Sequence, residues 1–194
     1  MGSYKIILAS ASPRRKELLS YLNIDFTIIP SNKDENASGS PEEIVKSLAL
    51  QKASDIASEY KDCFVIGADT IVCLDNKVLG KPKNKEDAFR MLSMLSGKKH
   101  RVLTGVCVYS PISKEFRIEY DSTDVYFEDL SDEEINAYIA TGEPFDKAGS
   151  YAIQGIGGAM ISRIDGCASN VIGLPLPLLK KMLIEQKAIA SWLK

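Results

Sequence analysis

Short runs of apolar residues alternate along the chain with longer stretches in which apolar residues recur every three to four positions. The short runs predict strands, and the longer periodic stretches predict helices with one buried face. Residues 63–68 are almost continuously apolar, which predicts a central strand covered on both faces. Strands are expected over residues 5–9, 26–29, 63–68, 102–109, 116–127, 151–153 and 159–164, with a hairpin over 70–79 that turns at Asp75 and Asn76.

The expected helices begin at residues that can cap them. Ser12 stands before Pro13, and Ser40-Pro41-Glu42-Glu43 combines a capping box with proline at the first helical position. Asn84 can cap a further helix, and Gly97 suits the position just past its end. Helices are therefore expected over residues 13–22, from 41 to at least 56, over 85–95, from 131 to before 142, and over about 176–193.

Length and composition place the chain among ordinary globular proteins. Its 194 residues correspond to one domain with room for two lobes. Hydrophobic residues make up 45% and charged residues 26%, which excludes collagen-like, disordered and coiled-coil classes. The alternation of strands and helices predicts a single α/β domain over residues 1–194, in which hairpins contribute antiparallel pairing.

Charge, cysteine pattern and hydropathy limit which classes of partner and which cellular compartment are expected. A net charge of −2 disfavours nucleic acid as a partner but permits a local basic cleft. The four cysteines form no CxxC pair, so we expect reduced thiols rather than a zinc site. No apolar run approaches the length of a membrane span, and the first residues lack the apolar stretch of a signal peptide. These features predict a cytoplasmic protein with no membrane partner.

The segment Ser10-Ala11-Ser12-Pro13-Arg14-Arg15 lies where the first expected strand passes into the first expected helix. In open α/β folds this junction is a place where ligands bind, and a helix N-terminus suits a phosphate. Arg14 and Arg15 oppose the helix dipole in the first turn, which indicates an anion to be held there. The alternative is a capped helix with two solvated arginines.

Carboxylates occur at two further places where chemistry is plausible. Asp69, in Gly67-Ala68-Asp69-Thr70, is expected at the end of the most buried strand, where it could bind a divalent metal or act as general base for a water molecule. Asp34 and Glu35 lie in a polar loop and could reach the same ion. A turn aspartate and an ordinary acidic loop are the alternatives.

Basic and glycine-rich segments complete the candidate chemistry. Lys81 follows Gly80 in a rigid turn, and Lys52 lies on the second helix, where a solvated lysine is the alternative. Residues 141–158 contain more glycines and charged residues than a loop between two elements needs. Such long glycine-rich segments are typical of loops whose backbone approaches a ligand. No P-loop or GxGxxG motif is present. For His100, the only histidine, a structural role is expected.

Taken in order, these segments resemble the Maf family of nucleotide pyrophosphatases. The resemblance spans nearly the whole chain, and the ordered set is far more specific than any one segment. Its members are Ser10-Ala11-Ser12-Pro13-Arg14-Arg15-Lys16-Glu17-Leu18-Leu19, Gly67-Ala68-Asp69-Thr70, Gly80-Lys81-Pro82, Ser96-Gly97 with His100, Asp146-Lys147-Ala148-Gly149, Gln154-Gly155, and residues 170–175.

The resemblance implies an elongated, mixed central sheet flanked by helices, with two lobes around a cleft, as in inosine-triphosphatase-like folds. It implies metal-dependent hydrolysis of a nucleoside triphosphate to the monophosphate and pyrophosphate, with Mg²⁺ or Mn²⁺ as the cation, by a homodimer. Arg14, Thr70 and Gln154 resemble the branch that acts on dTTP and UTP. A purine house-cleaning pyrophosphatase of the ITP/XTP type and a non-enzymatic regulator of septum formation are the alternatives.

Each residue then has a hypothetical role. Asp69 would bind the metal and activate the attacking water, with Glu35 as a second carboxylate on the ion. Thr70 and Gln154 would recognise the base, because a Gln amide offers the donor and the acceptor that the imide edge of thymine or uracil needs. The triphosphate would be neutralised and bound by Ser10, Arg14, Arg15, Lys52 and Lys81.

Overall fold

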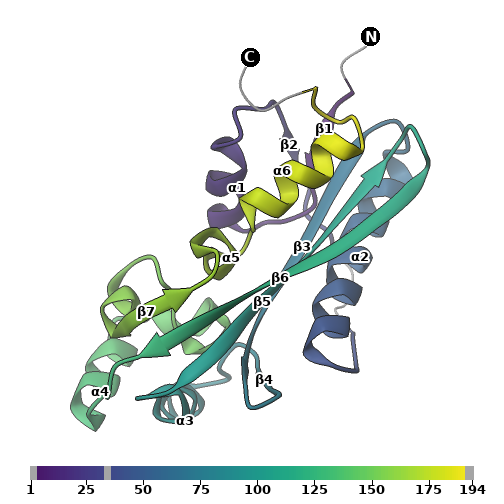
Figure 1. The fold of residues 1–194 in the computed structure, drawn as a ribbon. Coiled ribbons are helices and arrows are strands. Elements are labelled where there is room, and N and C mark those ends of the chain that lie inside the picture. Colours follow the sequence, from purple (N-terminus) through teal and green to yellow (C-terminus); the bar gives the residue numbers. More distant parts are fainter. Residues whose placement is uncertain (1–3, 33–35, 191–194) are drawn as a thin grey trace. The chain divides into compact units, whose positions relative to one another are not determined.

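The computed structural model describes residues 4–32 and 36–190, and its strands and helices alternate along the chain as the hydrophobic pattern predicts (Figure 1). The strands are β1 (Ile6–Leu8), β2 (Thr27–Ile28), β3 (Phe64–Leu74), β4 (Lys77–Leu79), β5 (Lys99–Ser110), β6 (Glu115–Phe127) and β7 (Ile161–Asp165). The helices are α1 (Pro13–Ser20), α2 (Pro41–Glu59), α3 (Lys85–Leu95), α4 (Asp132–Ala140), α5 (Ala168–Ile172) and α6 (Leu176–Glu185). Short 3₁₀ helices are η1 (Glu143–Asp146), η2 (Ala148–Ser150) and η3 (Ile156–Met160).

Within the described residues, seven strands form one mixed sheet in the order β2-β1-β3-β5-β6-β7, with β4 paired to β3. Strand β1 runs parallel to both β2 and β3, whereas β4 and β7 pair antiparallel to β3 and β6. Asp75 and Asn76 turn the β3–β4 hairpin with φ of 47° and 64°. The expected mixed α/β class, the hairpin and its turn are therefore confirmed.

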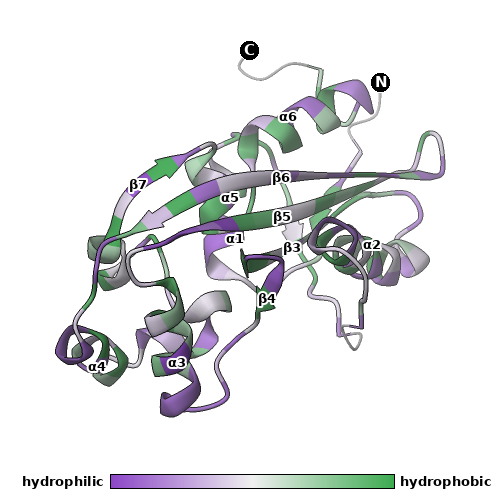
Figure 2. Cartoon of the chain, turned by 60° about the horizontal axis from the view of Figure 1, so that its bottom comes forward, coloured by the Kyte–Doolittle hydropathy of each residue, from purple (hydrophilic) through white to green (hydrophobic). Residues whose placement is uncertain are grey.

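The described chain divides into two compact units. The first draws on the ranges 4–69, 104–121 and 173–190, and the second on 70–103 and 122–172. Strands β3, β5 and β6 contribute residues to both units. In Figure 2 the hydrophobic colour follows β5 along much of its length, which agrees with the burial of most of its side chains.

In the first unit, helix α2 packs directly on the sheet. Ala49 and Ala53 of α2 are fully buried, with Val65 of β3 and Cys107 of β5 in the same cluster. The absence of a side chain at Gly67 permits this packing, because a Cβ atom there would lie 2.3 Å from the carbonyl oxygen of Ala49. A Cβ atom at Gly105 would similarly lie 2.1 Å from the carbonyl oxygen of Val45. The backbone of α2 therefore lies against two neighbouring strands.

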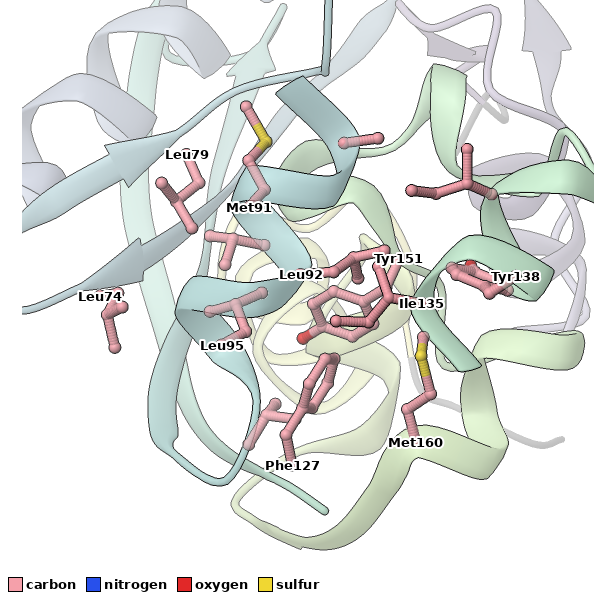
Figure 3. Packing of buried hydrophobic residues seen from close by; sticks show 14 of the residues in the cluster. Leu74, Leu79, Met91, Leu92, Leu95, Phe127, Ile135, Tyr138, Tyr151 and Met160 are labelled. Carbon is pink, nitrogen blue, oxygen red and sulfur yellow. The ribbon is translucent and has the colours of Figure 1, made fainter. Parts of the chain in front are cut away.

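The second unit has its own core, built where α3 and α4 face strand residues and the segment after η2 (Figure 3). Phe127 and Tyr151 meet edge to face, with their ring centroids 4.7 Å apart. Ser131 opens α4 with a capping box, and Asn84 caps α3 through a hydrogen bond from the Asp87 N–H, as expected. Gly97 follows the end of α3 with φ of 64°, also as expected.

One expected strand is absent, and two expected boundaries are wrong. Residues 151–153 form no strand, because the neighbouring Gly149, Ser150 and Gly155 all have positive φ and turn the backbone into η2 and η3. Because of these turns, the following strand begins at Ile161 rather than at residue 159. The last helix ends at Glu185, not near 193, because Lys187 has φ of 62° and the Ala188 N–H donates back to Leu183.

Candidate functional site

The junction between β1 and α1 holds one arginine in a defined position. Ser12 caps α1 by accepting a hydrogen bond from the Arg15 N–H at 3.4 Å. The Arg15 side chain donates through Nε to the carbonyl of Gly173 at 2.9 Å and through Nη1 to Ser10 Oγ at 3.3 Å. Ser10 Oγ also accepts from the Ser12 N–H at 3.2 Å, so its own O–H can donate elsewhere. The junction thus presents cations and N–H groups at a helix N-terminus.

The strand register places Asp69 near this junction. Leu8 of β1 is paired in parallel with Ile66 of β3, so Ser10 and Asp69 both lie just beyond the paired segment of two adjacent strands. The expectation that Asp69 ends its strand is wrong. The strand runs on to Leu74, because residues 71–74 are apolar and residues 72–74 pair with β4. Strand alternation directs the side chains of Asp69 and Thr70 to opposite faces of β3.

Lys52 and Asp69 form an ion pair in the first unit. The distance from Lys52 Nζ to Asp69 Oδ1 is 2.6 Å, and the two side chains are 14% and 11% exposed. The pair follows from the packing of α2, since Lys52 directly precedes Ala53, whose backbone lies against Gly67. Lys52 therefore contacts the predicted catalytic carboxylate, and its contact with a phosphate stays a prediction.

The predicted metal ligands are only partly described. Glu35 and its neighbour Asp34 lie outside the described residues. In residues 4–32 and 36–190 no three His, Cys, Asp or Glu side chains gather in a way that could hold a metal ion. Asp69 offers a little-exposed carboxylate, and such oxygen donors suit Mg²⁺ and Mn²⁺. The donor that the structure describes therefore fits the expected kind of cation.

The remaining predicted site residues belong to the second unit. Thr70 is half-buried in β3, whereas Lys81 and Gln154 are exposed. The Gly149 N–H donates to the carbonyl of Gly80 at 3.0 Å, which ties the glycine-rich segment to the residue before Lys81. The structure thus brings Ser10, Arg14, Arg15, Lys52 and Asp69 into one unit, and Thr70, Lys81 and Gln154 into the other.

In the second unit, sequence reasoning assigned no role to Glu143 and a structural role to His100. The carboxylate of Glu143 accepts hydrogen bonds from Tyr138 and from two backbone N–H groups of the glycine-rich segment. Its place in the dense segment 141–158 was the only signal that could have found it. His100 is 2% exposed, and its Nε2 lies 2.7 Å from the hydroxyl of Tyr151. The expected structural role of His100 agrees with this burial.

We expect His100 to make the protein less stable below neutral pH. Burial lowers the pKa of His100 from 6.5 to about 4. The unfolded chain therefore binds a proton that the folded chain does not between these values, so stability falls as pH decreases from 6.5 towards 4. The loss is about 2 kcal/mol by pH 5. Urea unfolding at pH 7.5 and pH 5 measures it.

His100→Gln is the matched control, because glutamine can still hydrogen-bond to the Tyr151 hydroxyl but does not titrate. Its stability should change little between the same two pH values. An equal loss in both proteins would assign the acid sensitivity to other groups.

A family model described as Maf-like protein matches residues 5–186 of the chain. A dTTP/UTP pyrophosphatase of Ruminiclostridium cellulolyticum is 49% identical over 181 residues, which cover 92% of this chain and 94% of that protein. One of Caldicellulosiruptor bescii is 51% identical over 185 residues, covering 92% and 93%. Among solved structures, the Staphylococcus aureus Ham1 protein is similar with a TM-score of 0.51 at 16% identity, over 81% of this chain and 79% of that one, which shows a shared fold. No helix in the described ranges is both long and apolar enough to cross a membrane.

Proposed function

The chain belongs to the Maf-like protein family, and from this premise we propose that it hydrolyses nucleoside triphosphates, preferring dTTP and UTP, to the monophosphate and pyrophosphate. The proposal rests on relatives named dTTP/UTP pyrophosphatase that are about half identical over nine-tenths of the chain. The observation that carries it in the structure is the Lys52–Asp69 pair near the Arg15 and Ser10 cluster. A carboxylate and cations beside the N-terminus of α1 suit a phosphoanhydride and an attacking water.

In the proposed reaction, residues of the first unit bind phosphates and accept a proton, and Lys81 keeps its predicted phosphate contact. Arg15, held by Gly173 and Ser10, presents a fixed positive charge, and Ser10 can donate its O–H to a phosphate oxygen. Asp69 takes a proton from water as the water oxygen bonds to phosphorus. The bond between the α and β phosphates breaks, and pyrophosphate leaves. Positioning and charge neutralisation supply most of the rate in such transfers.

Asp69 and Glu35 are the residues that would hold a divalent cation. When bound, Mg²⁺ or Mn²⁺ would offset the charge of the phosphates. Lys52 would then hold the Asp69 carboxylate in position, because its ammonium lies 2.6 Å from Asp69 Oδ1. Thr70 and Gln154, with Arg14, would recognise the base. We propose that the protein is cytoplasmic, acts on free nucleotides and forms a homodimer. Light scattering of the purified protein measures the mass of the particle and so tests the homodimer.

We expect pyrophosphate release to be strongest with dTTP and UTP and to need a divalent cation. A panel of dTTP, UTP, CTP, ATP, GTP, ITP and XTP, each with Mg²⁺, with Mn²⁺ or with EDTA, measures both properties. Greatest release with ITP or XTP would keep the pyrophosphatase activity but discard the roles of Thr70 and Gln154. Release from no nucleotide would overturn the proposed reaction.

A further inference from the structure

The turn that carries Gln154 is attached to a distant carboxylate. Glu143 of η1 accepts the Ile156 N–H through Oε2 and the Gly157 N–H through Oε1, both at 3.0 Å. Glu143 Oε1 also accepts the hydroxyl of Tyr138 in α4 at 2.9 Å. One carboxylate therefore joins α4, η1 and the start of η3, and two of its three bonds go to backbone just after Gln154.

The backbone beside Gln154 turns at a glycine that packs against the Glu143 carboxylate. Gly155 has φ of 105°, a region that residues with a side chain rarely adopt. A Cβ atom on Gly155 would lie 2.6 Å from Glu143 Oε2, so the carboxylate packs against the Cα of the residue after Gln154. The Gly158 N–H donates back to the Gly155 carbonyl and closes the turn. The position of the carboxylate and the path of the turn thus depend on each other.

Glu143 is suited to this task because it remains ionised. Burial raises the pKa of its carboxyl group, but the hydrogen bonds from Gly157, Ile156 and Tyr138 outweigh burial and hold the pKa below its ordinary value. An ionised carboxylate accepts on both oxygens, which the two backbone donors require. Lys147 lies at the other end of η1 and donates to the Glu143 carbonyl at 3.1 Å, which further restrains the segment.

We propose that Glu143 is a positioning residue for base selectivity: it sets the orientation in which Gln154 meets the pyrimidine base. The inference rests on the proposed function. Gln154 is exposed, so the path of its backbone determines where its amide can reach. An amide that must pair with both a donor and an acceptor on an imide edge tolerates little tilt. Glu143 contacts the turn and has no predicted contact with the triphosphate.

Glu143→Gln tests the inference: the Ile156 and Gly157 N–H groups donate to different oxygens, and an amide replaces one of these acceptors by an NH₂ group. We expect kcat/KM for dTTP and UTP to fall about tenfold, mainly through KM, with little change for ATP and GTP. Gln154→Ala should produce the same loss of selectivity. The double variant should then lose no more than Gln154→Ala alone, because both substitutions remove one interaction with the base.

Glu133→Gln is the matched control, since Glu133 is an exposed carboxylate in the first turn of α4. Equal losses for purine and pyrimidine nucleotides in Glu143→Gln, or additive losses in the double variant, would overturn the inference while the proposed function stood. Failure of the wild-type protein to release pyrophosphate would overturn the proposed function and this inference with it. Amide hydrogen exchange needs no activity: unchanged protection of Ile156 and Gly157 in Glu143→Gln would also contradict the role of Glu143.

Discussion

Asp69→Asn is expected to lower the rate of pyrophosphate release about 10³-fold, the typical contribution of a positioned general base. An amide cannot take a proton from water, and it is a poorer ligand for Mg²⁺ than a carboxylate. The substitution leaves the size of the side chain unchanged, and its oxygen can still accept from Lys52. Turnover at saturating dTTP, with the melting temperature measured in parallel, separates lost chemistry from lost folding.

Asp62→Asn provides the matched control. Asp62 is exposed in the turn before β3, and its substitution removes one negative charge away from the proposed site. Its turnover should equal that of the wild-type protein. Normal turnover in Asp69→Asn, with the fold intact, would remove Asp69 from the proposed reaction. The base and the metal ligand would then have to be sought among other carboxylates.

Gly67→Ala is expected to lower the free energy of unfolding by at least about 3 kcal/mol. The added methyl group would lie 2.3 Å from the carbonyl oxygen of Ala49 and 2.7 Å from the backbone nitrogen of Ala53. Both are backbone atoms of α2, so the whole helix must shift rather than one side chain. A shifted α2 also carries Lys52 away from Asp69, so activity should fall together with stability.

Gly80→Ala is the control for this substitution. A Cβ atom on Gly80 would have no neighbour within 4 Å in the described part of the chain, and Gly80 does not have a positive φ. Its free energy of unfolding should stay within about 0.5 kcal/mol of the wild-type value. Urea unfolding followed by circular dichroism measures both variants. Equal midpoints for the two would show that α2 does not pack on β3 as described.

The elements that the sequence predicts well are those governed by neighbouring residues. Ser12, Ser40 and Asn84 cap helices where expected, because a side chain that satisfies an N–H three residues away needs no distant partner. Asp75 and Asn76 turn the hairpin for the same local reason. Residues 151–153 fail as a strand because Gly149, Ser150 and Gly155 adopt positive φ, which an apolar pattern does not reveal.

The candidate site, too, has features that the sequence predicts and features that depend on the folded structure. The residue types of the site could be chosen from the sequence, since the carboxylates, arginines and lysines stand in ordered motifs. The pairing of Lys52 with Asp69 could not, because it depends on how α2 is rotated over β3. Glu143 was overlooked for a related reason: its partners Ile156 and Gly157 lie 13 and 14 residues further along the chain.

By itself, the sequence determined the alternation of strands and helices, most of their starting points and the family to which the chain belongs, because these depend on local pattern and on ordered motifs. Only the tertiary structure decided which charges meet. Lys52 of helix α2 reaches Asp69 because Gly67 and Gly105 leave room for the helix, and the Glu143 carboxylate accepts two backbone N–H groups just after Gln154. Close packing and hydrogen bonds join residues distant in the chain, and their geometry exists only once the chain has folded.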